Sequence, residues 1–367
     1  MERLYDKLKA YSESDFYAFH MPGHKRNKAL LGIELPYDLD ITEIDGFDDL
    51  HHADGILKEE QERAARVFGA EKSHFLVNGS TAGILSAVMG CTHRGDKILV
   101  ARHCHKSIYH AIYMNGLVPR YVYPEFDISM HMNGEISKED VAKALAAEPD
   151  IKAVVIVSPN YDGVVSDVKG IAEVAHSYRI PLIVDEAHGP HFGFHPAFPG
   201  RANDLGADVV INSLHKTLPS LTQTAILHIN GKLANRRRIK KYLDMLQSSS
   251  PSYIFMASLD ACVDFLDGKC EEAFELYVER LQKFREELKP LQHLQILRTE
   301  HYDISKVVIS TANANITSPE LADRLRKEYH LEMEMTGGTY VLAMTTVADT
   351  QEGLDRLKSA LLEIDDQ

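Results

Sequence analysis

Short apolar segments recur through the middle of the chain, and stretches with a helical pattern separate them. The segments lie at residues 74–77, 97–100, 120–123, 153–157, 181–184, 208–211 and 224–229. Several of them are continuous aliphatic runs, which are typical of strands that a parallel sheet buries on both faces. The alternation of strands with helices predicts right-handed βαβ units and a doubly wound, mainly parallel α/β sheet.

Helix signals support this alternation. Ser137 precedes an acidic first turn, which predicts a capped helix, and a second helix is predicted at 167–178. A long charged helix is predicted at about 271–289. The tail that follows has the pattern of a compact α+β unit, with strands near 307–310 and 340–344. A helix between them is expected to have Ser318 as its cap and Pro319 at its first position.

Changes in composition divide the chain into four predicted parts. Residues 1–52 contain scattered Pro and Gly and predict an irregular N-terminal arm. A Ser-rich stretch at 247–252 marks the end of a large domain at 53–250. Linking helices are then expected at 251–295 and a small α+β domain at 296–367.

Charge and cysteine content narrow the class of protein. Lys and Arg total 40 against 54 Asp and Glu, a formal charge of −14, so nucleic acid is an unfavourable partner. The basic run at 236–241 is interpreted as a solvated helix face. Four cysteines without metal-ligand spacing indicate a reducing cytoplasm. No apolar run approaches the roughly 18 residues of a membrane span, so no membrane partner is expected.

Polar residues follow the first two predicted strands, at the strand ends where α/β sheets bind their ligands. Gly79, Ser80 and Thr81 come between the first strand and a helical pattern. Backbone N–H groups and hydroxyls at a helix start can hold a phosphate, although an ordinary Ser/Thr helix cap has the same pattern. Beyond the second strand, either His103 or His105 could stack on a ring, and a structural histidine is the alternative.

An acidic residue follows the fifth predicted strand. Asp185 stands at the mouth of a buried strand, where its carboxylate needs a cationic partner such as a pyridinium N–H. The same Asp-Glu-Ala-His motif occurs in helicases, but those need an upstream phosphate loop that this sequence lacks. The spacing of His188, His191 and His195 matches no strong metal motif, so we expect no metal.

A lysine follows the sixth predicted strand. Lys216 lies a few residues beyond that buried strand, between Ser213 and His215 on one side and a threonine on the other. A desolvated lysine has a lowered pKa and attacks aldehydes. A phosphate cup, an acid for a ring nitrogen and this lysine are together what pyridoxal 5′-phosphate (PLP) requires, so we expect PLP bound covalently to Lys216.

At this point the sequence resembles the fold type I, PLP-dependent ornithine/lysine/arginine decarboxylases of bacteria. The resemblance is dense over about the first two thirds of the chain. Its motifs lie at residues 20–25, 40–43, 48–51, 75–81, 103–107, 183–189, 213–217 and 250–253. The larger members of the family also have an N-terminal receiver-like wing and a longer C-terminal domain. We expect a short form of the family without these two parts, and the tail beyond Ser310 matches the family poorly.

The resemblance implies roles for individual residues. Lys216 would hold the cofactor aldehyde, Asp185 the ring nitrogen, and His105 would stack on the ring. His188 would lie near the 3′ oxygen of the cofactor or the substrate carboxylate. The phosphate contacts implied by the resemblance, together with the cup, are Gly79, Ser80, Thr81, Ser213 and His215.

The resemblance also implies an assembly. The loop that contains Ser249 and Ser250 would reach the phosphate of a neighbouring subunit, so a homodimer or larger assembly is expected. The implied reaction is decarboxylation of lysine, ornithine or arginine to CO2 and an amine, a step of polyamine metabolism. Another PLP reaction at Cα (transamination, racemisation or aldol cleavage) and a non-catalytic PLP-binding protein are the alternatives.

A basic substrate would need an acid for its distal cation, because burying that charge alone is costly. The arm and the tail are both rich in carboxylates, and we single out Glu43 and Glu334 as hypotheses. The alternative is that both are solvated surface acids.

Overall fold

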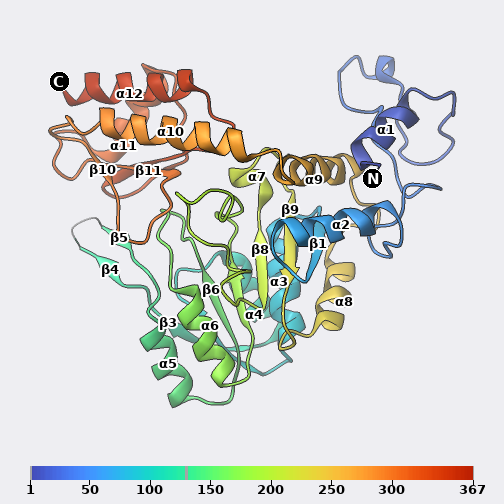
Figure 1. The fold of residues 1–367 in the computed structure, drawn as a ribbon, viewed down its shortest axis with the longest axis horizontal. Coiled ribbons are helices and arrows are strands. Elements are labelled where there is room, and N and C mark those ends of the chain that lie inside the picture. The colour runs from blue at the N-terminus through green and yellow to red at the C-terminus, as the bar shows by residue number, and fades with distance from the viewer. Residues whose placement is uncertain (1, 129–130, 367) are drawn as a thin grey trace.

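The computed structural model describes residues 2–128 and 131–366 and is built around one seven-stranded sheet (Figure 1). All seven predicted segments are strands of this sheet, in the order β1-β9-β8-β7-β6-β2-β3. Neighbouring strands are parallel except that β9 is antiparallel to both β1 and β8. Their bounds are β1 Lys72–Leu76, β2 Lys97–Ala101, β3 Val118–Val122, β6 Ile151–Val157, β7 Leu182–Asp185, β8 Val209–Asn212 and β9 Ala225–Ile229.

Helices cover both faces of the sheet, which explains the continuous apolar strands. Figure 1 shows α6 (Val168–Ser177) in front of the sheet, with α3 (Gly79–Cys91) and α4 (Lys106–Asn115) behind it. α5 (Lys138–Ala147) packs beside α6, and α8 (Arg236–Leu246) packs against α3. Residues 153–156 of β6 are at most 1% exposed, as expected for a strand with helices on each side.

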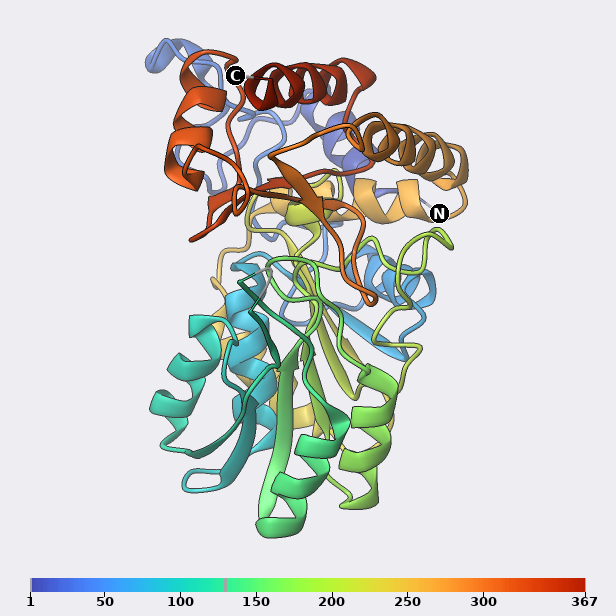
Figure 2. The same ribbon diagram turned by 90° about the vertical axis from the view of Figure 1, so that its left-hand side faces the viewer.

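A second, antiparallel sheet stands above one end of the large sheet (Figure 2). Its order is β10-β11-β13-β12, and the strands are β10 Gln295–Leu297, β11 Lys306–Ser310, β12 Met335–Thr336 and β13 Tyr340–Met344. The helices α10 (Glu271–Glu287), α11 (Ser318–Lys327) and α12 (Gln351–Asp365) belong to the same lobe. The division of the chain at residues 52, 250 and 295 stays a prediction.

Two local expectations are wrong. The cap of α11 is Thr317 rather than Ser318, because the Thr317 side chain and the Glu320 carboxylate cap each other's backbone N–H groups. The arm is not irregular throughout, because it opens with a regular helix, α1 (Leu4–Ser12), whose Leu4 and Leu8 are fully buried. The elements that remain are η1 Lys28–Leu30, α2 Ile56–Val67, β4 Phe126–Asp127, β5 Met132–Asn133, α7 Leu214–Thr217 and α9 Tyr253–Leu266.

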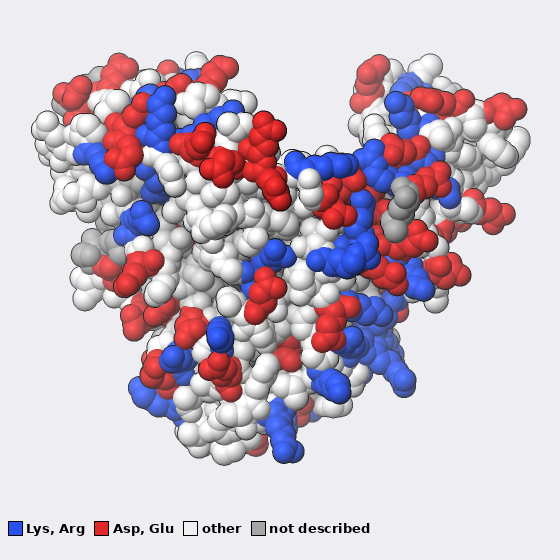
Figure 3. All heavy atoms as spheres, viewed as in Figure 1, with Lys and Arg blue, Asp and Glu red and all other residues white. Residues whose placement is uncertain are grey.

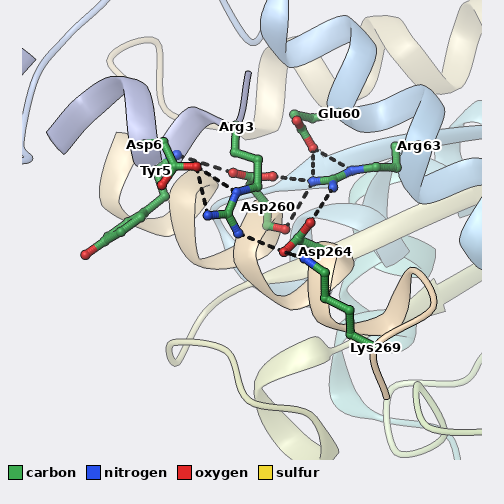
Figure 4. A network of polar contacts seen from close by, with 8 residues as sticks. All are labelled: Arg3, Tyr5, Asp6, Glu60, Arg63, Asp260, Asp264 and Lys269. Carbon is green, nitrogen blue, oxygen red and sulfur yellow. Dashed lines mark hydrogen bonds and ion pairs between the residues drawn. The ribbon is translucent and has the colours of Figure 1, made fainter. Parts of the chain in front are cut away.

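A buried ionic network attaches α1 to the body of the protein (Figure 4). Arg63 of α2 lies between Glu60 and Asp260, two carboxylates with no exposed surface, and its Nη1 is 3.1 Å from Asp264 Oδ1. Arg3, beside α1, binds the other oxygen of Asp264 at 2.7 Å. Burial and the neighbouring Asp260 raise the pKa of Glu60. The arm is therefore attached by charges that are costly to separate.

The surface gives two further facts. On the face seen in Figure 3, charges of both signs are interspersed, and a notch separates the arm from the lobe that contains α12. Within the described part of the chain, none of the helices combines the length and apolar character that crossing a membrane requires.

Candidate functional site

Two adjacent parallel strands bring Asp185 and Lys216 to the same edge of the sheet. Asp185 is the last residue of β7 and pairs in register with Ile211 of β8, and Lys216 follows in the short helix α7. Asp185 is 3% exposed, and its Oδ1 accepts a hydrogen bond from the backbone of Ala187 at 3.2 Å. Burial raises the pKa of Asp185 to about 6, although the charge of Lys216 opposes this shift.

His188 contacts Lys216 directly. The Lys216 Nζ lies 3.0 Å from His188 Nε2. Burial lowers the pKa of Lys216, while the charges of Asp185 and Glu334 act in the opposite direction. Burial, followed by the charges of Lys306 and Lys216, lowers the pKa of His188 well below its usual value, so the imidazole is neutral.

A second lysine, which we did not predict, lies on the other side of His188. Lys306 opens β11, has no exposed surface, and places its Nζ 3.1 Å from His188 Nδ1. Its stem passes Gly163, where an added Cβ would be 2.7 Å from Lys306 Cγ, so only glycine fits there. Burial lowers the pKa of Lys306 to about 8. In the sequence, Lys306 looks like a surface lysine at the start of a strand, and only its place before the apolar run 307–309 hints at burial.

The tail also supplies an acid. The Tyr161 hydroxyl donates a hydrogen bond to Glu334 Oε1, and the Tyr161 ring lies 4.7 Å from the His188 ring, centroid to centroid. The charge of Glu334 acts on both Lys216 and Lys306, so this acid lies near them. Glu43 lies elsewhere, beside Tyr253, whose pKa it helps to raise.

The two candidate ring-stacking histidines differ in their surroundings. His105 caps α4, and its Nδ1 is 2.8 Å from Ser107 Oγ. Burial and then the charge of Lys216 lower the pKa of His105, which places it beside the lysine. The pKa of His103 is lowered to about 4 by burial alone, and its Nδ1 has no partner among the described residues. Which of the two histidines stacks on a ring stays a prediction.

The expected phosphate cup is the start of α3. Gly79 adopts φ +73°, and its N–H donates to the carbonyl of Gln223 at 3.0 Å. Ser80 is half-buried in the first turn of α3, and Thr81 is exposed there. A helix start with such residues attracts anions.

The other expected phosphate contacts vary in exposure. Ser213 is fully buried, and its Oγ has no partner within the described chain. His215 Nδ1 donates to the carbonyl of Thr224 at 2.9 Å. Ser249 and Ser250 are exposed, and their loop reaches α3 because the N–H of Ser248 donates to Asn78 Oδ1.

The remaining histidines of the motif point to other partners. His191 lies 3.0 Å from Thr217 Oγ1 and 3.1 Å from Asp303 Oδ1, and His195 is 2.9 Å from Glu275 Oε2. Over residues 2–128 and 131–366, no group of three His, Cys, Asp or Glu is arranged to hold a metal ion.

The raised pKa of Asp185 makes a testable prediction about stability. Burial raises the pKa of its carboxyl group from the ordinary 3.8 to about 6 in the folded protein, so stability is lost as the pH rises from about 4 through 6. In protein free of small molecules, Asp185→Asn should not show this loss. The unfolding free energy of the variant minus that of the wild type should therefore be about 1–3 kcal/mol larger at pH 8 than at pH 4. Denaturant titration at both pH values measures this difference.

Asp15→Asn, which removes an exposed carboxylate, is the control and should not show this gain. If the unfolding free energies of Asp185→Asn and the wild type differ by the same amount at both pH values, burial does not raise the pKa of Asp185.

Comparisons with known proteins agree with this arrangement. The family model described as Orn/Lys/Arg decarboxylase, major domain, matches residues 3–308. The chain is 35% identical to a protein of Bacillus subtilis named arginine decarboxylase, over 99% of this chain and 77% of that protein. It is 28% identical to the constitutive lysine decarboxylase of Escherichia coli, over 78% of this chain and 43% of that protein.

Solved structures share the fold. The Escherichia coli constitutive lysine decarboxylase superposes with a TM-score of 0.84 at 22% identity, over 98% of this chain, and this chain spans 60% of its length. The alanine–glyoxylate aminotransferase of Nostoc sp. gives a TM-score of 0.68 at 15% identity, over 84% of this chain and 86% of that one. The expected fold type I architecture is confirmed. The chain belongs to the Orn/Lys/Arg decarboxylase family.

Proposed function

We propose that the chain is a PLP-dependent decarboxylase that converts a basic amino acid (lysine, ornithine or arginine) to CO2 and the corresponding amine. One observation carries the proposal: Lys216 is largely buried at a strand end, 3.0 Å from His188 and close to the buried Asp185, in a member of this family. Relatives named arginine or lysine decarboxylase support the substrate class.

The residues at this edge fit PLP. The Asp185 carboxylate accepts one hydrogen bond within the described residues, from the backbone N–H of Ala187 to Oδ1, so its Oδ2 is left to accept from a cationic ring N–H. Ser213 Oγ is a buried hydroxyl without a partner among the same residues, and the start of α3 can attract anions. A ligand with a protonated ring nitrogen and a phosphate would satisfy both groups.

Each residue has a distinct part in the proposed chemistry. PLP, when bound, supplies an electron sink for the pair that CO2 leaves at Cα. Lys216 would bind the aldehyde covalently, and Asp185 would keep a proton on the ring nitrogen. His105 would pack against the ring, and His188, neutral and in contact with Lys216, could exchange a proton with it. Gly79, Ser80, Thr81, Ser213 and His215, with Ser249 and Ser250, would hold the phosphate.

Glu334 supports a basic substrate. It lies at an exposed position near Lys216, where Tyr161 fixes its carboxylate by a hydrogen bond. An amino acid whose α-amine reacts at Lys216 could extend its distal cation toward this acid. Two arginines that an aminotransferase might use for a carboxylate, Arg324 and Arg326, instead pair with Glu328 and Asp323 on α11.

A homodimer is part of the proposal. The arm beyond α1 projects at one side of the notch in Figure 3, and it exposes many large apolar side chains. These are Phe16, Tyr17, Phe19, Met21, Leu30, Leu31, Ile33 and Leu35, each at least 46% exposed. Such a cluster on a projecting segment favours burial against a second copy of the chain. The exposed Ser249 and Ser250 could then reach a neighbouring site.

The first prediction from this proposal concerns the covalent bond. Incubation with PLP followed by borohydride reduction should leave a pyridoxyl group on Lys216, because it combines a lowered pKa with partial exposure, whereas Lys306 is fully buried. Peptide mapping by mass spectrometry locates the group. Lys216→Met should abolish the label, whereas a label on Lys306 or on surface lysines in its place would disprove the assignment.

The second prediction concerns the substrate. Glu334→Gln should raise KM for a diamino acid about tenfold, because a hydrogen bond to a charged group contributes about 1.5 kcal/mol. Borohydride labelling of Lys216 should be unchanged. Steady-state kinetics on arginine, lysine and ornithine make the measurement.

Glu332→Gln is the matched control, since Glu332 is exposed on the same segment and should leave KM unaltered. Glu43→Gln tests the rival acid. A rise in KM for Glu43→Gln alone would move the distal site to the arm.

A further inference from the structure

His188 lies between two lysines. Its Nε2 is 3.0 Å from Lys216 Nζ, and its Nδ1 is 3.1 Å from Lys306 Nζ. The lysines come from different parts of the fold, because Lys216 follows β8 of the large sheet and Lys306 opens β11 of the small one. The proposed function gives Lys306 no part.

Counting hydrogens limits the protonation states of this group. A neutral imidazole donates from one nitrogen and accepts at the other, whereas an ammonium group only donates. Burial keeps His188 neutral, so it can accept from just one ammonium. Both contacts can be hydrogen bonds only when at least one lysine is a neutral amine, because two ammonium groups would need two acceptor nitrogens on His188. The three side chains therefore hold at most one excess proton, which either lysine can carry.

Acids lie near both ends of the group. The negative charge of Glu334 favours the charged form of both lysines, so the proton has a counter-charge whether it is on Lys216 or on Lys306. Burial lowers the pKa of both lysines, which brings them closer to the pH at which an amine is neutral. The charged groups around the chain of three are Asp185 near Lys216, Asp303 and Asp162 near Lys306, and His105 and His215 near His188.

Lys306 is held firmly in place. Its carbonyl accepts hydrogen bonds from Tyr302 Oη at 2.7 Å and from Arg285 Nη2 at 2.8 Å. Gly163 leaves room for its stem and for nothing larger than a hydrogen. These contacts fix the backbone and the first carbons of the Lys306 side chain, from which Nζ extends to His188.

We propose that Lys216, His188 and Lys306 form a proton relay in which Lys306 takes up the proton that Lys216 must lose before it can attack an aldehyde. The N–H bond of Lys216 breaks as its proton binds His188 Nε2, and the Nδ1–H bond breaks as that proton binds Lys306 Nζ. One positive charge moves from Lys216 to Lys306, and no proton leaves the site. Lys306 is thus a positioning residue, and the inference rests on the proposed role of Lys216.

The test follows the nucleophilicity of Lys216 in protein without PLP. Competitive acylation by acetic anhydride across pH 6–11, read by mass spectrometry, gives the pH at which Lys216 loses its proton. Lys306→Met should raise that pH by about one unit, which is tenfold slower labelling at pH 7, because no second lysine then competes for the proton. Lys152→Met, on an exposed position of β6, should leave the profile unchanged.

A second variant, Lys306→Arg, should shift the pH at which Lys216 loses its proton in the opposite direction. Arginine stays charged and cannot accept a proton, so Lys306→Arg should hold His188 with its proton on Nε2 and lower the pH at which Lys216 becomes reactive. Packing alone would not shift the two variants in opposite directions. If neither variant folds, the pH profile of Lys216 acylation in the wild type tests the relay. A proton shared with Lys306 gives Lys216 two titration steps, whereas an independent Lys216 gives one.

The relay and the proposed function can fail separately. If PLP and borohydride label Lys216, but the pH profiles of Lys216 acylation are the same in the wild type and in Lys306→Met, the relay is wrong and the proposed function stands. A shifted profile without PLP capture at Lys216 would keep the relay and overturn the proposed cofactor.

Discussion

The rest of the site depends on one constraint, the burial of ionisable groups at the carboxyl edge of the large sheet. Parallel strands β7 and β8 end side by side, so Asp185 and Lys216 leave the sheet at the same level. Helices on both faces exclude water from the strands, and burial at their ends raises the pKa of Asp185 and lowers those of His188 and Lys216. Charged groups at such a place need partners of opposite charge nearby. Asp185 and Lys216 act as partners for each other, because the charge of each favours the charged form of the other.

The small sheet completes this environment. Lys306 on β11 and Glu334 before β12 reach the edge of the large sheet, and Tyr161 lies between Glu334 and His188. The site is therefore built from two sheets, and its charge balance depends on how they are placed together. A shift of the small lobe would separate Lys306 from His188 and change the proton balance of Lys216.

Much of the fold was predictable because local pattern determined it. The seven apolar segments are the seven strands, and Asp185 and Lys216 stand where doubly wound sheets place functional residues. The cap of α11 was predicted one residue late, although the sequence contains the signal: Glu320 lies three residues after Thr317, the spacing of a capping box, whereas Leu321 lies three after Ser318. The roles of the site residues stay predictions.

The sequence analysis did not predict that Lys306 and Tyr161 belong to the site, for a physical reason. Their contacts with His188 join segments far apart in the chain, and no local periodicity records such a contact. A lysine at the start of a strand is typical of a solvent-exposed residue, and only the tertiary structure shows that this one is buried. The same holds for Glu334, which sequence could name as one acid among several but could not place beside Lys216.

The central claim is that this site removes CO2 from a basic amino acid. Its most direct test is to incubate the PLP-loaded protein with carboxyl-labelled arginine, lysine, ornithine, leucine and glutamate, and to measure labelled CO2 and keto acid together. The account predicts stoichiometric CO2 and amine from at least one of the three basic amino acids, with little release from leucine or glutamate. Keto acid without CO2, or equal CO2 from the neutral and acidic substrates, would contradict it.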